Sequence, residues 1–499
     1  MEPIRTDLQY FEPTHTIHTS FTERTDAIVP DAEPDIGRIL CAYASVSVKD
    51  ELPQNDRILL SGTVSVVVLF RPDGQDIIRF LQIPLSFAHI EETPGILPES
   101  PCFVRCQVAD VSASAVNSRK VSVTATLSLE VEVFAESGVS LTEGIDAEGD
   151  DALEVLYGSQ TIPLLRHADV REYTVLDDVE LAGAQGLRLI SARGTLCPVS
   201  CQSGESQVTL SGEAVLSLLL LDDTGAIQPM SQVIPYTQVL DAPGLHASLP
   251  TSARLSLRNL DCMLREDGVL SVGLGVRALL LQQGEENIQT VRDLYHLHRI
   301  LNFDTRDVSL CAYHTDTPFV LESSAILPVV RPAGEILMAD GICLSLDTKS
   351  ASPEARVQVS LLYRDPAGAL CAEQQIVSAP LPNLTLPDGA RPCDLSARVS
   401  ASPGSDGNVP LRITVSGDLI TQSQVPVRDI TALSDDTPRP PLEPAGTTLI
   451  LRYIHTAVPL WEIGKQYAST AQAIRQANAL PDGTDTVADT MLLIPVYAQ

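Results

Sequence analysis

The chain has 499 residues, of which 64 are acidic and 33 are basic, so its formal net charge at neutral pH is -31. A charge of this sign repels phosphate backbones and anionic membrane surfaces, which argues against nucleic acid and lipid headgroups as partners and favours a protein, including a basic one. Hydrophobic residues make up 44% of the sequence and charged residues 19%, which excludes a disordered chain and indicates a folded protein of several domains.

The N-terminal segment MEPIRTDLQYFEPTHT has no basic region followed by an apolar stretch, and no segment reaches about 18 uninterrupted apolar residues. We therefore expect neither export nor an integral membrane segment, and a cytoplasmic location. The ten cysteines are scattered along a long chain. Without an export signal, they are expected to be reduced thiols.

Two segments that lie about 150 residues apart are similar to each other. ILLSGTVSVVVLFRPDG at 58–74 matches VTLSGEAVLSLLLLDDTG at 208–225, with Ser61-Gly62 falling on Ser211-Gly212. A weaker third copy, VQVSLLYRDPAG at 357–368, follows Glu354-Ala355 in place of the Ser-Gly pair. The sequence thus predicts a repeating unit, with a third copy that is degenerate.

Within a unit, apolar residues alternate with polar ones, as in VSVTATLSLEVEVF at 121–134. A period of two is typical of strands in an antiparallel sheet with one buried face. The sequence therefore predicts a mainly β protein, in which each unit is an antiparallel β-sandwich or partly open barrel of five or more strands. Within such a sheet, Gly62 is interpreted as a bulge or packing position rather than a point of approach for a ligand.

The predicted β domains occupy residues 1–146, 147–284 and 285–433. Between the first two, the acidic, glycine-containing segment 136–151 is interpreted as a solvated loop, because its carboxylates lack the spacing of a calcium loop. Residues 434–446 contain four prolines and predict a stiff linker that holds the last module, residues 447–499, at a distance.

The last module has its own pattern of two strands and two helices. Residues 447–454 form a candidate strand, and Leu460, Ile463, Gly464 and Tyr467 follow at helical spacing. Ser469 with Gln472 is interpreted as a capping box that opens a second helix, and residues 491–496 form a closing strand. The predicted order is β, α, α, β.

This module resembles the LysM family over its whole length, through Leu460-Trp461-Glu462-Ile463, Ala477-Asn478-Ala479-Leu480 and Leu492-Leu493-Ile494-Pro495. The family usually has Gly-Asp-Thr before its Leu-Trp, in a loop that lines the groove for N-acetylglucosamine chains. Here Ala457-Val458-Pro459 stands in that place. Because these residues offer few hydrogen bonds, the exchange favours an apolar contact over a sugar.

The resemblance implies a groove that binds a partner or a glycan, and a small hydrophobic core. The groove would comprise Ala457, Val458, Pro459, Leu460, Leu480, Pro481 and Asp482. The core would comprise Trp461, Ile463, Tyr467, Ile474 and Ile494. For Trp461, the only tryptophan, the alternative to a core position is an exposed interface.

The upstream units resemble the SPOCS domain of spore coat proteins, over residues of about 57–134 and 207–282. SPOCS domains before a LysM module are the arrangement of coat morphogenetic proteins. The resemblance implies a non-enzymatic scaffold or adaptor in the mother-cell cytoplasm that is recruited to the forespore surface. Its LysM module would contact the ATPase of the coat basement layer, and the chain would contact other spore coat proteins. The alternative is a protein that binds peptidoglycan glycan chains of the cell wall or spore cortex.

Signatures of catalysis are missing from the sequence. There is no Gly-x-Ser-x-Gly and no phosphate-binding Gly-Lys-Ser/Thr loop, and Gly273-Leu274-Gly275 lacks the third glycine of a dinucleotide fingerprint. The pairs Cys102/Cys106 and Cys197/Cys201 do not have zinc-knuckle spacing. We expect no enzyme, no catalytic residue, no metal and no cofactor.

Overall fold

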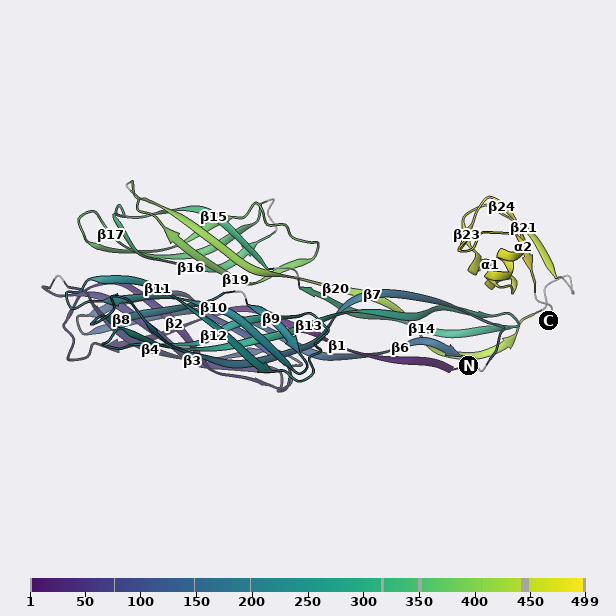
Figure 1. Ribbon diagram of the computed structural model, residues 1–499, viewed down its shortest axis with the longest axis horizontal. Helices are drawn as coiled ribbons and strands as arrows, with labels where there is room; N and C mark the ends of the chain where they lie inside the picture. Colours follow the sequence, from purple (N-terminus) through teal and green to yellow (C-terminus); the bar gives the residue numbers. More distant parts are fainter. Residues whose placement is uncertain are drawn as a thin grey trace.

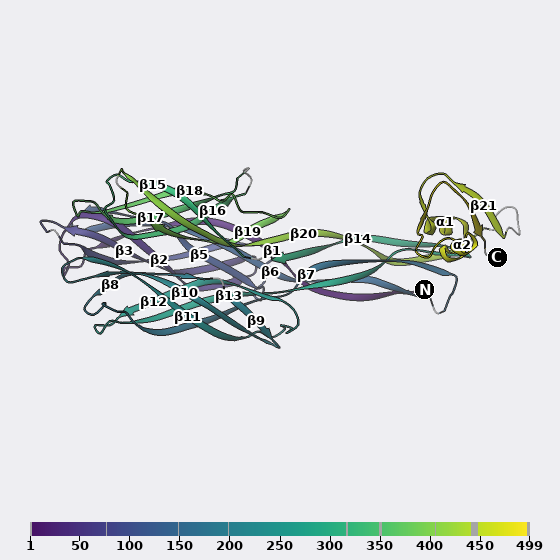
Figure 2. The same cartoon turned by 45° about the horizontal axis from the view of Figure 1, so that its top comes forward.

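The computed structural model describes residues 2–75, 77–147, 149–197, 199–315, 318–348, 352–404, 406–440 and 448–496. The molecule is elongated, with β-sandwiches gathered at one end, a stalk of long strands, and a small module that contains both labelled helices at the other end (Figures 1 and 2). The expectation of a mainly β, antiparallel protein is confirmed. No helix within the described ranges is long and apolar enough to cross a bilayer.

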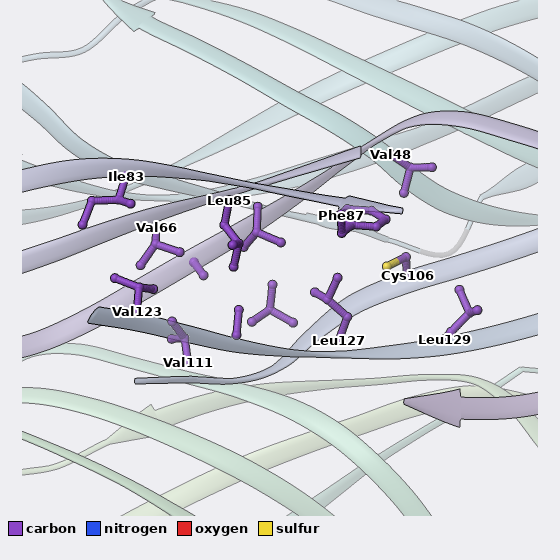
Figure 3. Packing of buried hydrophobic residues seen from close by; sticks show 14 of the residues in the cluster. Val48, Val66, Ile83, Leu85, Phe87, Cys106, Val111, Val123, Leu127 and Leu129 are labelled. Carbon is purple, nitrogen blue, oxygen red and sulfur yellow. The ribbon is translucent and has the colours of Figure 1, made fainter. Parts of the chain in front are cut away.

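The first sandwich is built from six strands. They are β1 (Glu2–Ile28), β2 (Ile36–Gln54), β3 (Arg57–Pro72), β4 (Arg79–Glu92), β5 (Cys102–Asn117) and β6 (Lys120–Asp146). The antiparallel sheet β2-β3-β4 packs on a second layer in which β6 lies between β1 and β5. Figure 3 shows the core between the layers, where Leu85 and Phe87 of β4 lie across from Leu127 and Leu129 of β6.

The predicted alternation of β6 is confirmed by its burial. Every second residue from Val121 to Val133 is at most 1% exposed, so one whole face of this strand belongs to the core. Branched aliphatic side chains dominate this face and favour the extended backbone that packs them.

The second and third segments repeat this order of strands. The second contains β7 (Leu153–Glu180), β8 (Arg188–Leu196), β9 (Ser200–Gly204), β10 (Gln207–Leu221), β11 (Ile227–Asp241), β12 (Thr251–Leu264) and β13 (Val269–His296). The third contains β14 (Arg299–Thr315), β15 (Phe319–Pro328), β16 (Glu335–Asp347), β17 (Glu354–Arg364), β18 (Leu370–Pro380), β19 (Ala390–Ala401) and β20 (Asn408–Pro438). Each segment has its own two-layered core, and the third is a complete sandwich in spite of its weak sequence similarity.

The third copy lacks glycine at this position because the residue opposite it in the neighbouring strand has also changed. Gly62 lies opposite Phe87 in the β3–β4 register, and a Cβ atom on Gly62 would lie 2.7 Å from that ring and 2.3 Å from the carbonyl oxygen of Ser47. In the second sandwich Gly212 lies opposite Tyr236. In the third, Ala355 lies opposite Ala379. A glycine therefore makes room for a large aromatic neighbour, and where the neighbour is alanine the glycine is not needed.

The stalk consists of the long strands where they continue past the sandwiches. It contains three antiparallel ribbons, β1 with β6, β7 with β13, and β14 with β20. Their apolar side chains form one cluster drawn from all six strands, including Tyr10, Leu141, Ile162, Ile288, Leu310 and Val427. The buried carboxylate of Asp429 joins two ribbons, since it accepts a hydrogen bond from the Thr142 amide at 2.8 Å and pairs with Arg306 at 3.0 Å.

The strands of the stalk contradict three predictions made from the sequence. Residues 136–146, expected to be a solvated loop, continue β6. Residues 285–296 continue β13, so the chain passes into the third segment at 297–298 instead of 284–285. The expected linker begins within β20, which ends at Pro438, and residues 441–446 of that linker lie outside the described part of the chain.

Buried charges join the three sandwiches where they meet the stalk. Arg254 of the second sandwich pairs with Glu132 of the first and Asp394 of the third, and both members of the Arg254–Glu132 pair are at most 2% exposed. Arg105 pairs with Asp394 at 2.6 Å, and Arg391 pairs with Glu132 at 2.9 Å. Buried ions are stable only when paired, so each sandwich completes the pairing of the others.

The module beyond the stalk contains β21 (Leu449–Ile454), β22 (Val458–Pro459), α1 (Leu460–Tyr467), α2 (Ala471–Ala477), β23 (Thr486–Val487) and β24 (Thr490–Pro495). β21 pairs antiparallel with β24, and β22 pairs with β23. The side chain of Thr470 caps α2 by accepting a hydrogen bond from the Ala473 amide at 3.0 Å. The cap is therefore Thr470 and not Ser469, which is fully buried.

Candidate functional site

The terminal module has a hydrophobic cluster between its helices and the β21–β24 sheet. Ile463, Ile474 and Ile494 are buried in this cluster together with Leu460, and Tyr467 packs against it. Four of the five residues expected in the core therefore lie there. Trp461 is not part of this cluster.

The residues expected to line a groove differ in their exposure. Ala457, Pro459, Pro481 and Asp482 are exposed. Leu460 is buried, whereas Val458 and Leu480 pack against the cluster as half-buried side chains. The two loops that contain these residues thus pack on the same small core. Their prolines and the Asp482 carboxylate are exposed to solvent.

The indole of Trp461 faces the stalk. Its N–H donates a hydrogen bond of 2.8 Å to the carboxylate of Asp293, near the end of β13. The Lys465 ammonium, one turn further along α1, donates to both oxygens of the same carboxylate at 2.7 and 2.8 Å. A single carboxylate therefore holds two side chains from one face of α1.

Aromatic rings and main-chain groups extend this contact. The ring of Tyr295 meets Trp461 edge to face at a centroid distance of 4.6 Å, and its hydroxyl donates to the Ser469 carbonyl at 2.8 Å. A Cβ atom on Gly464 would lie 2.6 Å from that hydroxyl, so only glycine lets α1 approach this closely. Arg439 donates to the Lys465 carbonyl at 3.2 Å. We call this set of interactions the module–stalk contact.

The module–stalk contact corrects two expectations. The module was expected to stand apart from the β domains, but α1 lies directly on the stalk tip. Trp461 was expected to belong to the module core, but it lies between the module and the stalk. The partners of Trp461 lie in the short segment Asp293-Leu294-Tyr295, where an acidic and an aromatic residue flank a buried leucine. Nothing in the sequence links that segment to α1.

The junction of the three sandwiches encloses a second feature, a cavity of about 230 Å³. Strands β2, β8 and β16 and strands β5, β12 and β19 all contribute to its wall. Arg193 pairs across it with Asp340 and lies over the ring of Tyr43, so one residue from each sandwich takes part. The lining mixes apolar side chains, hydroxyls and paired charges, which suits packing between sandwiches.

Cys393, Asp394 and Asp418 lie close enough together to share a metal ion, and they are the only such group among the residues that the structure describes. Arg105 and Arg254 both pair with Asp394 and hold the pKa of its carboxyl below the usual value against the opposing effect of burial. Burial, together with the charge of Asp394, raises the pKa of Asp418 to about 6. Two guanidinium groups at this position disfavour a metal cation.

Residues 35–116 match the protein-family model described as "SipL, SPOCS domain". This segment of the chain is similar to a SPOCS domain. The match associates it with sporulation and the spore coat. Comparison with curated proteins and with solved structures finds no match.

The SPOCS match covers the strands from β2 to β5 of the first sandwich. The same succession recurs from β8 to β12 and from β16 to β19. The ribbons of the stalk begin where these segments end, so the part of the chain that carries the match is the head and not the stalk.

Proposed function

We propose that this SPOCS-domain protein is a non-enzymatic scaffold of spore coat assembly, and that its terminal module is a LysM module that docks on the ATPase of the coat basement layer. The observation that carries the proposal is the architecture. A head with the SPOCS match lies at one end of the molecule, and a small module lies at the opposite end of a stalk (Figure 1). Such a shape separates two binding surfaces, which is what an adaptor between coat layers requires.

The stalk supports a structural role. Its ribbons share one apolar cluster, and the buried carboxylate of Asp429 in one ribbon accepts a hydrogen bond from the Thr142 amide of another, so they form one packed body and not three separate hairpins. The module–stalk contact holds α1 on that body. A partner bound to the module would thus stand in a defined position relative to the head.

The charge of the chain supports a protein partner over an anionic polymer. The terminal module, residues 447–499, has three basic and four acidic residues, so almost all of the net charge of -31 lies in the head and stalk. A nearly neutral module at the end of an acidic molecule can approach a protein surface without strong repulsion. The scaffold is proposed to act in the mother-cell cytoplasm and to be recruited to the forespore surface.

The experiment that tests this function is a comparison of two ligands on the full chain. Titration with the purified basement-layer ATPase should give saturable binding, and titration with N-acetylglucosamine oligomers should give none. Val458→Asp, which places a charge in the expected groove, should weaken ATPase binding. Saturable glycan binding with no ATPase binding would instead support a wall or cortex protein that binds peptidoglycan chains.

A further inference from the structure

The β21–β24 sheet of the module has an apolar face on its solvent side. In the register of the two strands, Leu449 lies opposite Pro495, Leu451 opposite Leu493, and Tyr453 opposite Met491. We call these six residues the outer sheet face. Four of its side chains are largely exposed, namely Leu449 at 53%, Leu451 at 61%, Tyr453 at 44% and Met491 at 53%.

The opposite face of the same sheet is already occupied. Ile450, Ile454, Leu492 and Ile494 alternate with the outer residues and pack into the module cluster under the helices. Arg452, the remaining inner position of β21, lies over the ring of Tyr467 at 5.3 Å. Hence the apolar outer residues are not needed for the fold of the module.

The outer sheet face also points away from the stalk. α1 lies between the module cluster and the stalk tip, because Trp461, Gly464 and Lys465 face Asp293 and Tyr295. In both views the helices lie nearer the stalk, and β21 lies on the far side (Figures 1 and 2). The module–stalk contact thereby presents this face at the end of the molecule.

A second copy of the chain is a poor occupant for this face. Two strands of six residues cover an area of about 20 by 10 Å, so two copies packed face to face would bury a few hundred Å², on the order of a crystal contact. Each copy also carries a net charge of -31. This repulsion opposes self-association at low salt.

A protein with an apolar patch among basic residues fits better. The acidic head and stalk attract such a partner over a distance, and the nearly neutral module allows apolar contact at short range. We infer that the outer sheet face is the surface on which a partner protein docks through an apolar patch that basic residues surround. This inference deepens the proposed function, on which it rests, and gives the basement-layer ATPase a contact on the sheet as well as on the loops.

The test uses the full chain and the purified basement-layer ATPase. Leu451→Glu places a charge in the centre of the outer sheet face without removing a buried side chain. Its matched control is Leu176→Glu on β7, a leucine that is 78% exposed in the head, which adds the same charge elsewhere. We expect Leu451→Glu to weaken binding at least tenfold, Leu176→Glu to leave it unchanged, and the association rate of the unaltered protein to fall as salt is added.

Three results would overturn the inference, and each has a different consequence. If Leu451→Glu binds as the unaltered protein does while Val458→Asp does not bind, the partner uses the loops alone and the proposed function stands. If the unaltered protein does not bind the ATPase, the proposed function fails, and the occupant inferred here fails with it. Sedimentation that shows a dimer lost in Leu451→Glu would identify a second copy as the occupant.

Discussion

The side chains of Asp293 and Trp461 lie 168 residues apart in the sequence and are joined by a hydrogen bond of 2.8 Å between the indole N–H and a carboxylate oxygen. The same carboxylate accepts two hydrogen bonds from Lys465. The bond connects the last strand of the second repeat to α1, the first helix of the terminal module. The position of the module on the stalk therefore depends on a residue of the β repeats.

Asp293→Asn should release the module from the stalk tip. The substitution removes the charge that Lys465 pairs with and places an amide N–H₂ among donors. Because Trp461 is the only tryptophan, its emission reports on this contact alone, and we expect a shift to longer wavelength and stronger quenching by acrylamide. Asp307→Asn, at an exposed position of β14, is the control. Unchanged emission in Asp293→Asn would show that the carboxylate does not hold the module.

Trp461→Ala and Ile474→Ala should differ in what they disrupt. Ile474 is fully buried in the module cluster, and its truncation should cost about 2 to 5 kcal/mol and unfold the module. Trp461 lies outside that cluster, so its truncation should leave the module folded and free of the stalk. Hydrogen exchange of β21 and β24 distinguishes the two states. Loss of protection in Trp461→Ala as well would show that Trp461 belongs to the module core.

Arg254→Met should destabilise the head far more than a surface ion pair does. The substitution leaves Glu132 and Asp394 short of one partner in a buried site, and breaking a buried pair costs about 3 to 5 kcal/mol. Arg412→Met is the matched control, because Arg412 pairs with Glu322 at the surface, where both side chains are more than half exposed. The loss of unfolding free energy in Arg412→Met should stay below about 1 kcal/mol. Equal losses of unfolding free energy would contradict a role for the buried network.

Gly62→Ala should destabilise the first sandwich. The added methyl group would meet the Ser47 carbonyl at 2.3 Å and the ring of Phe87 at 2.7 Å, and overpacking of this kind costs about 1 to 3 kcal/mol. Gly138→Ala in the stalk ribbon is the control, since its Cβ would have only one neighbour, at 3.9 Å. Chemical denaturation of both variants measures the difference, and no loss in Gly62→Ala would refute the packing role.

Asp418→Asn should change how stability depends on pH. Burial raises the pKa of this carboxyl from 3.8 to about 6 in the folded protein. The protonated form is therefore favoured by folding, and its contribution to stability is present below pH 3.8 and is lost as pH rises through 6. An asparagine side chain does not ionise, so Asp418→Asn does not undergo this loss of stability. Denaturation across this range should show a smaller decline for the variant, and parallel curves would argue against the raised pKa.

Much of the fold was predictable from the alternation of residues. The face that begins at Val121 contains only apolar residues at every second position, and such a strand has one stable orientation with respect to a core. Comparison of the chain with itself located the repeats, and helical spacing between two candidate strands predicted the order of elements in the module. The weak third copy was harder to assess from the sequence. The presence of Ala355 in place of glycine is explained by Ala379, which lies opposite it in the neighbouring strand.

The stalk was missed for a physical reason. A two-stranded ribbon that packs with two others buries few of its side chains, so its sequence can be as polar as that of a loop. In the segment 136–146, Val139 and Leu141 reach the shared cluster, while glycines and acids face solvent. Composition alone could not distinguish this ribbon from a linker.

Periodicity within short segments was sufficient to predict that the repeats consist of strands, that a small helical module follows them, and that isoleucines fill the core of that module. That Arg254 joins three repeats, and that Trp461 lies against Asp293 and not in the module core, is evident only from the packing of the folded chain. Both relationships connect segments more than a hundred residues apart, and a single polar or aromatic side chain carries no periodic signal of its distant partner.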